Sequence, residues 1–61
     1  MKFSELRNIL EKAGCYIKRH GSDHDLYYSP KTGKIFPVGR HQSKEVPKGT
    51  LKSIFKQAGI K

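Results

Sequence analysis

Apolar residues recur at two different spacings along this chain, and the change of spacing separates helices from strands. Over residues 4–13 they fall three and four apart, with Leu6 and Leu10 among them, which predicts an amphipathic helix. Ser4 is the expected N-cap of this helix. Gly14 suits the left-handed position that ends a helix, so a new element should begin at Cys15.

The middle of the chain alternates apolar and polar residues, which is typical of strands. Strands are predicted over 15–20, 24–29 and 34–38, separated by a turn at 21–23 and a hairpin loop at 29–33. Pro37 fits a terminal or edge position, because proline cannot donate to a ladder. After a polar loop, helical spacing returns over 47–58. Pro47 suits its first turn and Gly59 its end.

The predicted order is α-β-β-β-α, in one domain covering residues 1–61. A three-stranded antiparallel sheet needs one face covered, and two amphipathic helices on that face would cover it. We therefore expect an α+β fold like that of double-stranded RNA-binding domains. The single cysteine excludes an internal disulfide, and we expect Cys15 to be a small buried residue.

Charge indicates a polyanionic partner. Thirteen Lys and Arg against five Asp and Glu give a formal charge of +8. Surplus lysines also keep small domains soluble, but these concentrate after Gly14, which favours nucleic acid. We expect no secretory leader and no membrane span, since Met1-Lys2-Phe3 opens directly into the amphipathic segment. The expected location is a bacterial-type cytoplasm.

The last predicted helix carries lysines four residues apart, which places them on one exposed face. A helix N-terminus surrounded by cations attracts phosphate. An ordinary solvated face is the alternative interpretation. The predicted phosphate-binding side chains are those of this row and of the preceding loop, namely Arg40, Lys44, Lys48, Lys52 and Lys56.

Three histidines, His20, His24 and His41, are candidates for chemistry. Their spacing does not suit a structural zinc site, so we expect no metal and no cofactor. RNA carries its own nucleophile, the 2′-hydroxyl, and a histidine transfers protons near neutral pH. His24 follows a tight turn at a strand start, where it would be exposed and fixed, although packing is the commoner role for such a residue. Asp23 and Asp25 are the candidates to orient its ring, although strand alternation puts Asp25 on the opposite face.

The strand tyrosines leave two interpretations open. Tyr16, Tyr27 and Tyr28 would serve either for stacking on nucleic-acid bases or for packing within the sheet. Packing is the preferred interpretation for Tyr28.

Two segments resemble the HicA toxin family. The first is Gly21-Ser22-Asp23-His24-Asp25-Leu26-Tyr27, a glycine turn with a histidine followed by an aliphatic and an aromatic residue. The second begins at Phe36-Pro37-Val38 and Arg40-His41, continues through residues 44–51, and ends at Gln57-Ala58-Gly59-Ile60. With the first-helix pattern, the resemblance spans nearly the whole chain, and the C-terminal segment is the more specific part.

This resemblance implies a toxin of a type II toxin–antitoxin system that cleaves mRNA with one histidine and is neutralised by a HicB-type antitoxin. Aligning Leu26-Tyr27 with the family makes His24 that histidine, with Asp23 as an insertion in the turn. His41 is a candidate phosphate or antitoxin contact. Two other hypotheses remain: a non-catalytic module that binds double-stranded RNA, and a basic protein that binds only an acidic partner.

Overall fold

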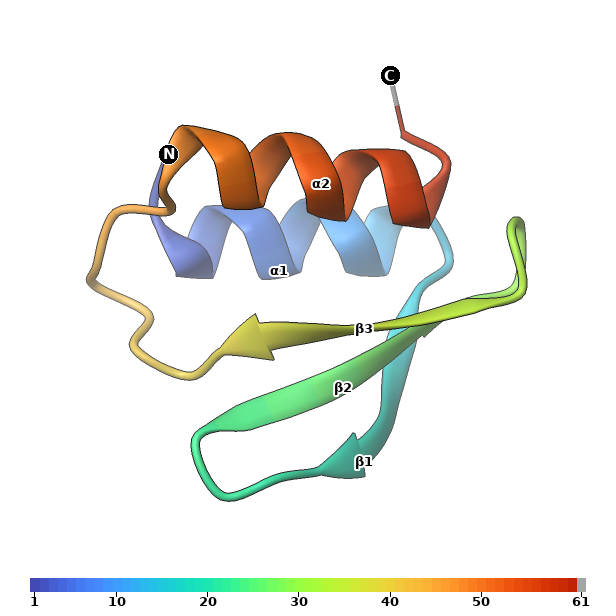
Figure 1. Cartoon of the computed structure of the whole chain (residues 1–61), viewed down its shortest axis with the longest axis horizontal. Coiled ribbons are helices and arrows are strands. Elements are labelled where there is room, and N and C mark those ends of the chain that lie inside the picture. Colours follow the sequence, from blue (N-terminus) through green and yellow to red (C-terminus); the bar gives the residue numbers. More distant parts are fainter. Residues whose placement is uncertain (61) are drawn as a thin grey trace.

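A computed structural model of the chain describes residues 1–60 and contains five elements (Figure 1). They are α1 (Phe3–Lys12), β1 (Tyr16–His20), β2 (His24–Ser29), β3 (Lys34–Gly39) and α2 (Lys48–Ala58). The predicted element order is confirmed. The predicted N-cap is wrong, because α1 begins before Ser4 and its N-cap is Lys2. The Glu5 carboxylate accepts the Lys2 backbone N–H at 3.1 Å, which stabilises this earlier start.

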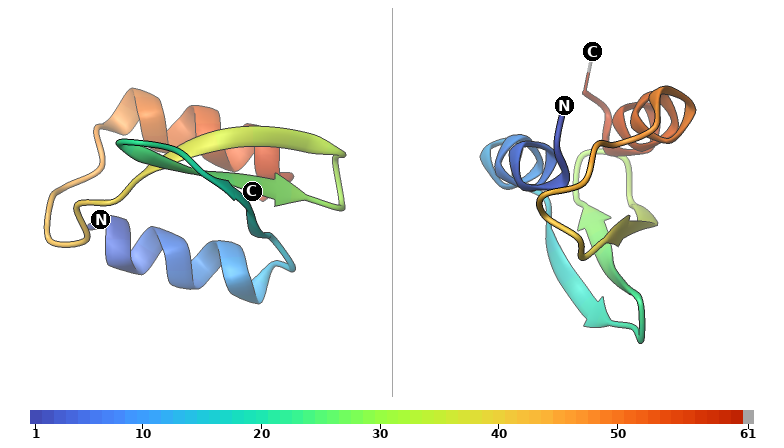
Figure 2. Two further views of the ribbon diagram at one scale, coloured as in Figure 1. Left: turned by 90° about the horizontal axis from the view of Figure 1, so that it is seen from below. Right: turned by 90° about the vertical axis from the view of Figure 1, so that its left-hand side faces the viewer.

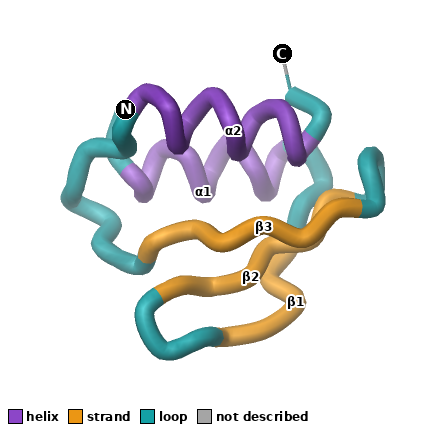
Figure 3. The backbone as a smooth tube through the Cα atoms, viewed as in Figure 1, coloured by secondary structure: helices purple, strands orange, loops and turns teal. Residues whose placement is uncertain are grey.

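The fold has two layers, helices above and sheet below. Both helices lie side by side over one face of the sheet (Figures 1 and 2). The strands form an antiparallel meander in the order β1-β2-β3, and Figure 3 shows the loops gathered at the two ends of these layers. The α+β arrangement of a double-stranded RNA-binding domain is therefore confirmed.

The core lies between the layers and uses the predicted apolar stripes. Leu6 and Leu10 of α1 are fully buried, and so is Phe36 of β3. The Tyr27 and Phe36 rings stack with their centroids 6.4 Å apart. Burying a side chain of this size stabilises the fold by about 1.5–3 kcal/mol. The remaining buried apolar residues are Cys15, Val38, Val46, Ile54 and Ala58.

Strand β1 departs from the predicted alternation. All five of its residues are exposed, and the strand extends beyond the helices (Figure 2). Its register against β2 shifts between Ile17 and Arg19, where a β-bulge inserts an extra residue. A bulge bends the strand and increases its twist, which explains why Ile17 is not buried with the core.

The hairpin between β2 and β3 is fastened to the end of α2. The buried Ser29 hydroxyl donates to the Ala58 carbonyl at 2.9 Å, and the Thr32 hydroxyl donates to that of Gln57. Gly59 has φ +79°, the left-handed conformation predicted for the helix end. A Cβ there would lie 3.0 Å from Cγ2 of Thr32, so this close approach also favours glycine.

Candidate functional site

His24 is the first residue of β2 and is exposed to solvent. The turn before it is closed by a hydrogen bond from the Gly21 N–H to the His24 carbonyl, at 2.7 Å. A Cβ on Gly21 would lie only 2.7 Å from that same oxygen, so no larger residue fits there. The tight turn predicted from the sequence therefore fixes the backbone that carries His24.

His24 lines a cleft of about 360 Å³ where four elements meet. The cleft brings together the starts of α1, β2 and α2 and the end of β3. Lys44 of the loop before α2 lies in the same cleft. A proton-transfer side chain and a cation therefore share one concave site. The other lining residues are Phe3, Pro37, Gly39, Glu45, Pro47 and Thr50.

The loop that carries Lys44 is fixed to the first turn of α1. The N–H of Phe3 donates to the Lys44 carbonyl at 3.0 Å, and the N–H of Ser4 donates to that of Gln42 at 3.1 Å. The first N–H groups of a helix have no partner within the helix. Here the loop supplies those partners, so the start of α1 and the position of Lys44 depend on each other.

Asp25 organises the other side of the strand. Its side chain is 7% exposed and faces the helices. Arg7 of α1 approaches one carboxylate oxygen to 3.0 Å. The other oxygen accepts from Nε of Arg40 at 3.0 Å and contacts Nδ1 of His20 at 2.8 Å. One buried carboxylate thus joins α1, the end of β1 and the loop after β3.

These contacts keep Asp25 ionised. Hydrogen bonds from His20, then Arg40 and Arg7, lower the pKa of the carboxyl from 3.8 to about 2, against the opposite effect of burial. An ionised carboxylate only accepts hydrogen bonds, so Nδ1 of His20 must carry the proton in this contact. Burial raises the pKa of the neighbouring Tyr27 hydroxyl, to which Arg7 donates at 3.2 Å.

Arg40 also holds the turn before His24. Its guanidinium donates to the Ser22 carbonyl at 3.2 Å and to the Gly21 carbonyl. Arg40 follows Gly39, which is the cross-strand partner of His24. The predicted phosphate-binding role of Arg40 stays a prediction, but in this structure its guanidinium contacts protein groups that position His24.

The other predicted phosphate contacts lie on α2 and in the loop before it. Lys48 begins α2 directly after Pro47, which lines the cleft. Lys52 and Lys56 are exposed further along the same helix. The exposed His41 lies in the loop, where its carbonyl accepts the Lys44 N–H at 3.1 Å. The cleft therefore brings together His24, Lys44 and the start of α2, but not the whole predicted set.

Sequence reasoning did not find the cluster around Asp25. Alternation already placed Asp25 on the face opposite His24, which is the face that the helices cover. A buried carboxylate requires cationic partners. The sequence could therefore have predicted that Asp25 has cationic partners. Strand alternation alone does not identify these partners as Arg7 and His20.

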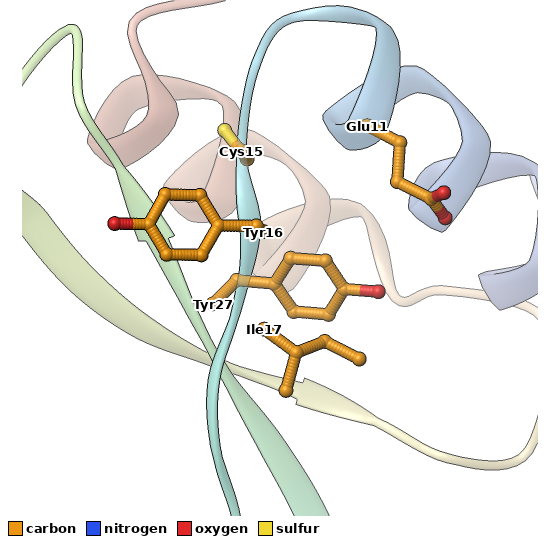
Figure 4. Close-up of a pocket in the computed structure, with 5 residues that line it drawn as sticks. All are labelled: Glu11, Cys15, Tyr16, Ile17 and Tyr27. Carbon is orange, nitrogen blue, oxygen red and sulfur yellow. The ribbon is translucent and has the colours of Figure 1, made fainter.

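A second cleft, of about 400 Å³, lies between α1 and β1 and is lined by Glu11, Cys15, Tyr16, Ile17 and Tyr27 (Figure 4). It contains none of the predicted site residues. Within residues 1–60, no three His, Cys, Asp or Glu side chains are grouped as metal ligands would be. Neither described helix is long and apolar enough to cross a membrane.

Together, the α+β fold, the charge of +8 and the histidine–lysine cleft define a small basic protein of the RNA-binding type. The chain belongs to the HicA family, described as the HicA toxin of bacterial toxin–antitoxin systems, which it matches over residues 3–60. It is 41% identical over 61 residues, 100% of both chains, to a protein of Photorhabdus laumondii subsp. laumondii named "Probable mRNA interferase HicA 2". No solved structure matches this chain.

Proposed function

We propose that this chain is a toxin endoribonuclease that cleaves mRNA, with His24 as its proton-transfer residue and without a metal ion. One observation carries this proposal: the exposed His24 shares a cleft with Lys44, and this cleft also includes the start of α2. Membership of the HicA family and similarity to a protein named an mRNA interferase support it.

The proposed reaction uses the substrate's own 2′-hydroxyl. His24 takes the proton of that hydroxyl as its oxygen attacks the adjacent phosphorus, or gives a proton to the 5′-oxygen that leaves. Charge that develops on the phosphate is stabilised by Lys44 and Lys48, aided by the N-terminus of α2. Lys52 and Lys56 extend this cationic side for the neighbouring phosphates, and His41 and Arg40 stay candidates for the same role.

The proposed partner is an antitoxin of the HicB type, acting in the cytoplasm. A protein that covers the cleft would exclude RNA from His24. The charge of +8 favours a partner with an acidic surface. If the neighbouring open reading frame encodes a larger acidic protein with a DNA-binding motif, this part of the proposal gains direct support.

Growth arrest and RNA cleavage test the proposal together. Wild type, His24→Ala and His24→Gln are expressed from an inducible promoter. The control is Lys12→Ala, which changes an exposed residue of α1. Wild type and the control should arrest growth and degrade mRNA, whereas both His24 variants should do neither. Equal toxicity of all four proteins would exclude His24 as the catalyst. RNA that is bound but left intact by wild type would favour a non-catalytic RNA-binding module.

A further inference from the structure

The sheet has an open face that no helix covers, and this face is largely apolar. Along β2, Asp25, Tyr27 and Ser29 are buried under the helices, so Leu26 and Tyr28 point the other way. Directly paired residues of antiparallel strands lie on the same face. The open face therefore carries two rows across the strands, Tyr16–Tyr28–Ile35 and Arg19–Leu26–Pro37.

One aromatic ring of this face, that of Tyr16, is accessible, and the ring of Tyr28 beside it is partly buried. Tyr16 is 50% exposed and Ile35 is 48% exposed. Figure 4 shows the Tyr16 ring pointing to the opposite side of β1 from Ile17 and Tyr27. The Tyr16 and Tyr28 rings lie 5.5 Å apart, inclined at 59°. The two tilted rings form one continuous aromatic surface, in which the Tyr16 ring is exposed to solvent.

The charge of the open face is positive. Nζ of Lys18 lies 4.8 Å from the Tyr28 ring centroid, and Arg19 belongs to the second row. Of the five acidic residues, Asp25 alone lies in a strand, and it faces the helices. Aromatic rings beside cations suit a polyanion with flat faces, because bases stack on the rings while phosphates contact the cations.

The open face is continuous with the cleft that contains His24. Pro37 belongs to the second row and also lines the cleft. By alternation, His24, Leu26 and Tyr28 share one face of β2. Tyr28 follows His24 by four positions in β2, a distance of roughly 13 Å. A single RNA strand with a phosphate at His24 would pass over Leu26 and reach the tyrosines within a few nucleotides.

From these contacts we infer that Tyr16 and Tyr28, with Lys18 and Arg19, form a base-stacking subsite that selects unpaired RNA next to the cleaved phosphate. This inference rests on the proposed function and adds the substrate class to it. Bases inside an RNA duplex are paired and stacked on each other, so they offer no free face to a protein ring. The subsite therefore favours single-stranded RNA, although the fold is that of double-stranded RNA-binding domains.

Binding is measured with the His24→Ala protein, so that cleavage does not interfere, and with a short RNA that wild type cleaves at one site. Tyr16→Ala in this background should weaken binding roughly 5- to 150-fold, as the loss of one base–ring stack by alanine substitution does. Tyr16→Phe keeps the ring and should bind like the parent. A blunt duplex of the same sequence should compete poorly with the single strand.

Abasic substitutions in the RNA test the same contact without changing the fold. Abasic sites are placed one at a time on each side of the cleaved phosphate. The His24→Ala protein should lose affinity at one position near that phosphate, and the same protein with Tyr16→Ala added should be insensitive at that position.

Three results would overturn the inference. The first is equal affinity for duplex and single-stranded RNA, and the second is the absence of a sensitive abasic position. The third is that Tyr16→Ala binds RNA as tightly as its parent but binds the antitoxin more weakly. The last would make this face a protein-docking surface. Loss of cleavage in His24→Ala is scored separately, so failure of the subsite does not resemble failure of the proposed catalyst.

Discussion

Arg40 and Asp25 are joined by a contact of 3.0 Å between Nε and a carboxylate oxygen, and the same guanidinium holds the turn that precedes His24. The pair therefore connects the loop after β3 to both sides of His24 in the sequence. A side chain that acts through this turn should affect the rate of the chemical step more than the affinity for RNA.

Arg40→Gln should lower kcat with little change in KM. Loss of the contacts to the turn lets His24 move relative to the phosphate, and misplacement by about 1 Å reduces rates by up to about 100-fold. Steady-state cleavage of a defined RNA at several salt concentrations measures both constants. Circular dichroism confirms that the variant is folded.

Lys48→Gln is the matched control for this prediction. As a phosphate contact, Lys48 should raise KM when removed and reduce the log–log salt slope of binding by about 1. If Arg40→Gln behaves in this way instead, Arg40 contacts phosphate directly and its positioning role is wrong.

Asp25 makes stability depend on pH in an acidic window. Its carboxyl has a pKa of about 2 in the folded protein, below its ordinary value of 3.8. The stabilisation is therefore fully present above about 3.8 and is lost as the pH falls through about 2. Urea midpoints measured between pH 6 and about pH 2 should fall steeply for wild type in this window.

Asp25→Asn should be less stable than wild type at neutral pH and should lose less of its remaining stability across the same window. The control is Asp23→Asn, which changes an exposed residue of the turn. Its stability should depend on pH as that of wild type does. An unaltered acid transition in Asp25→Asn would assign the acid sensitivity to other carboxyl groups.

Adjacent residues of β3 should differ sharply in their effect on stability. Phe36 is fully buried, and its replacement by alanine should cost about 3–5 kcal/mol. A chain of this length is stable by only roughly 3–9 kcal/mol, so Phe36→Ala should be largely unfolded near 37 °C. Ile35→Ala, on the open face, should change stability by about 0.5 kcal/mol or less. Thermal melts compare the two, and similar losses would contradict the facing assigned to β3.

Ser29→Ala should destabilise the packing of α2 on the sheet. The Ser29 hydroxyl is buried and donates to the last carbonyl of the helix, so its removal leaves that oxygen without this partner, at about 1–3 kcal/mol. Ser53→Ala, in which an exposed contact from Gln57 is lost, should have little effect. Chemical denaturation measures both, and equal midpoints for the two variants would show that the buried hydrogen bond contributes little.

The sequence was sufficient for the element order because each element is local. The stripe containing Leu6 and Leu10, the turn at Gly21 and the left-handed Gly59 depend on near neighbours alone. The start of α1 was wrong by one residue because Glu5 accepts the Lys2 N–H and loop carbonyls accept those of Phe3 and Ser4. Those loop carbonyls belong to a segment about 40 residues away in the chain.

The candidate site was predicted in part for the same reason. His24 was identified from its turn and from a family resemblance. Its position beside Lys44 depends on how the loop folds back on α1, which no local pattern specifies. The three partners of Asp25 come from three separate elements. Alternation predicts which face a strand residue occupies, but it does not predict what meets that face.

Single-turnover cleavage of a defined RNA by purified wild type and His24→Ala, in matched reactions with and without EDTA, tests the role of His24 most directly. Wild type should cleave this RNA with EDTA present, and His24→Ala should be slower by about 100- to 10,000-fold. Wild type should not cleave an RNA in which the nucleotide before the cleaved phosphate lacks its 2′-hydroxyl. Equal rates for the two proteins would contradict this assignment, and so would wild-type cleavage that occurs in a matched reaction without EDTA but not in its presence.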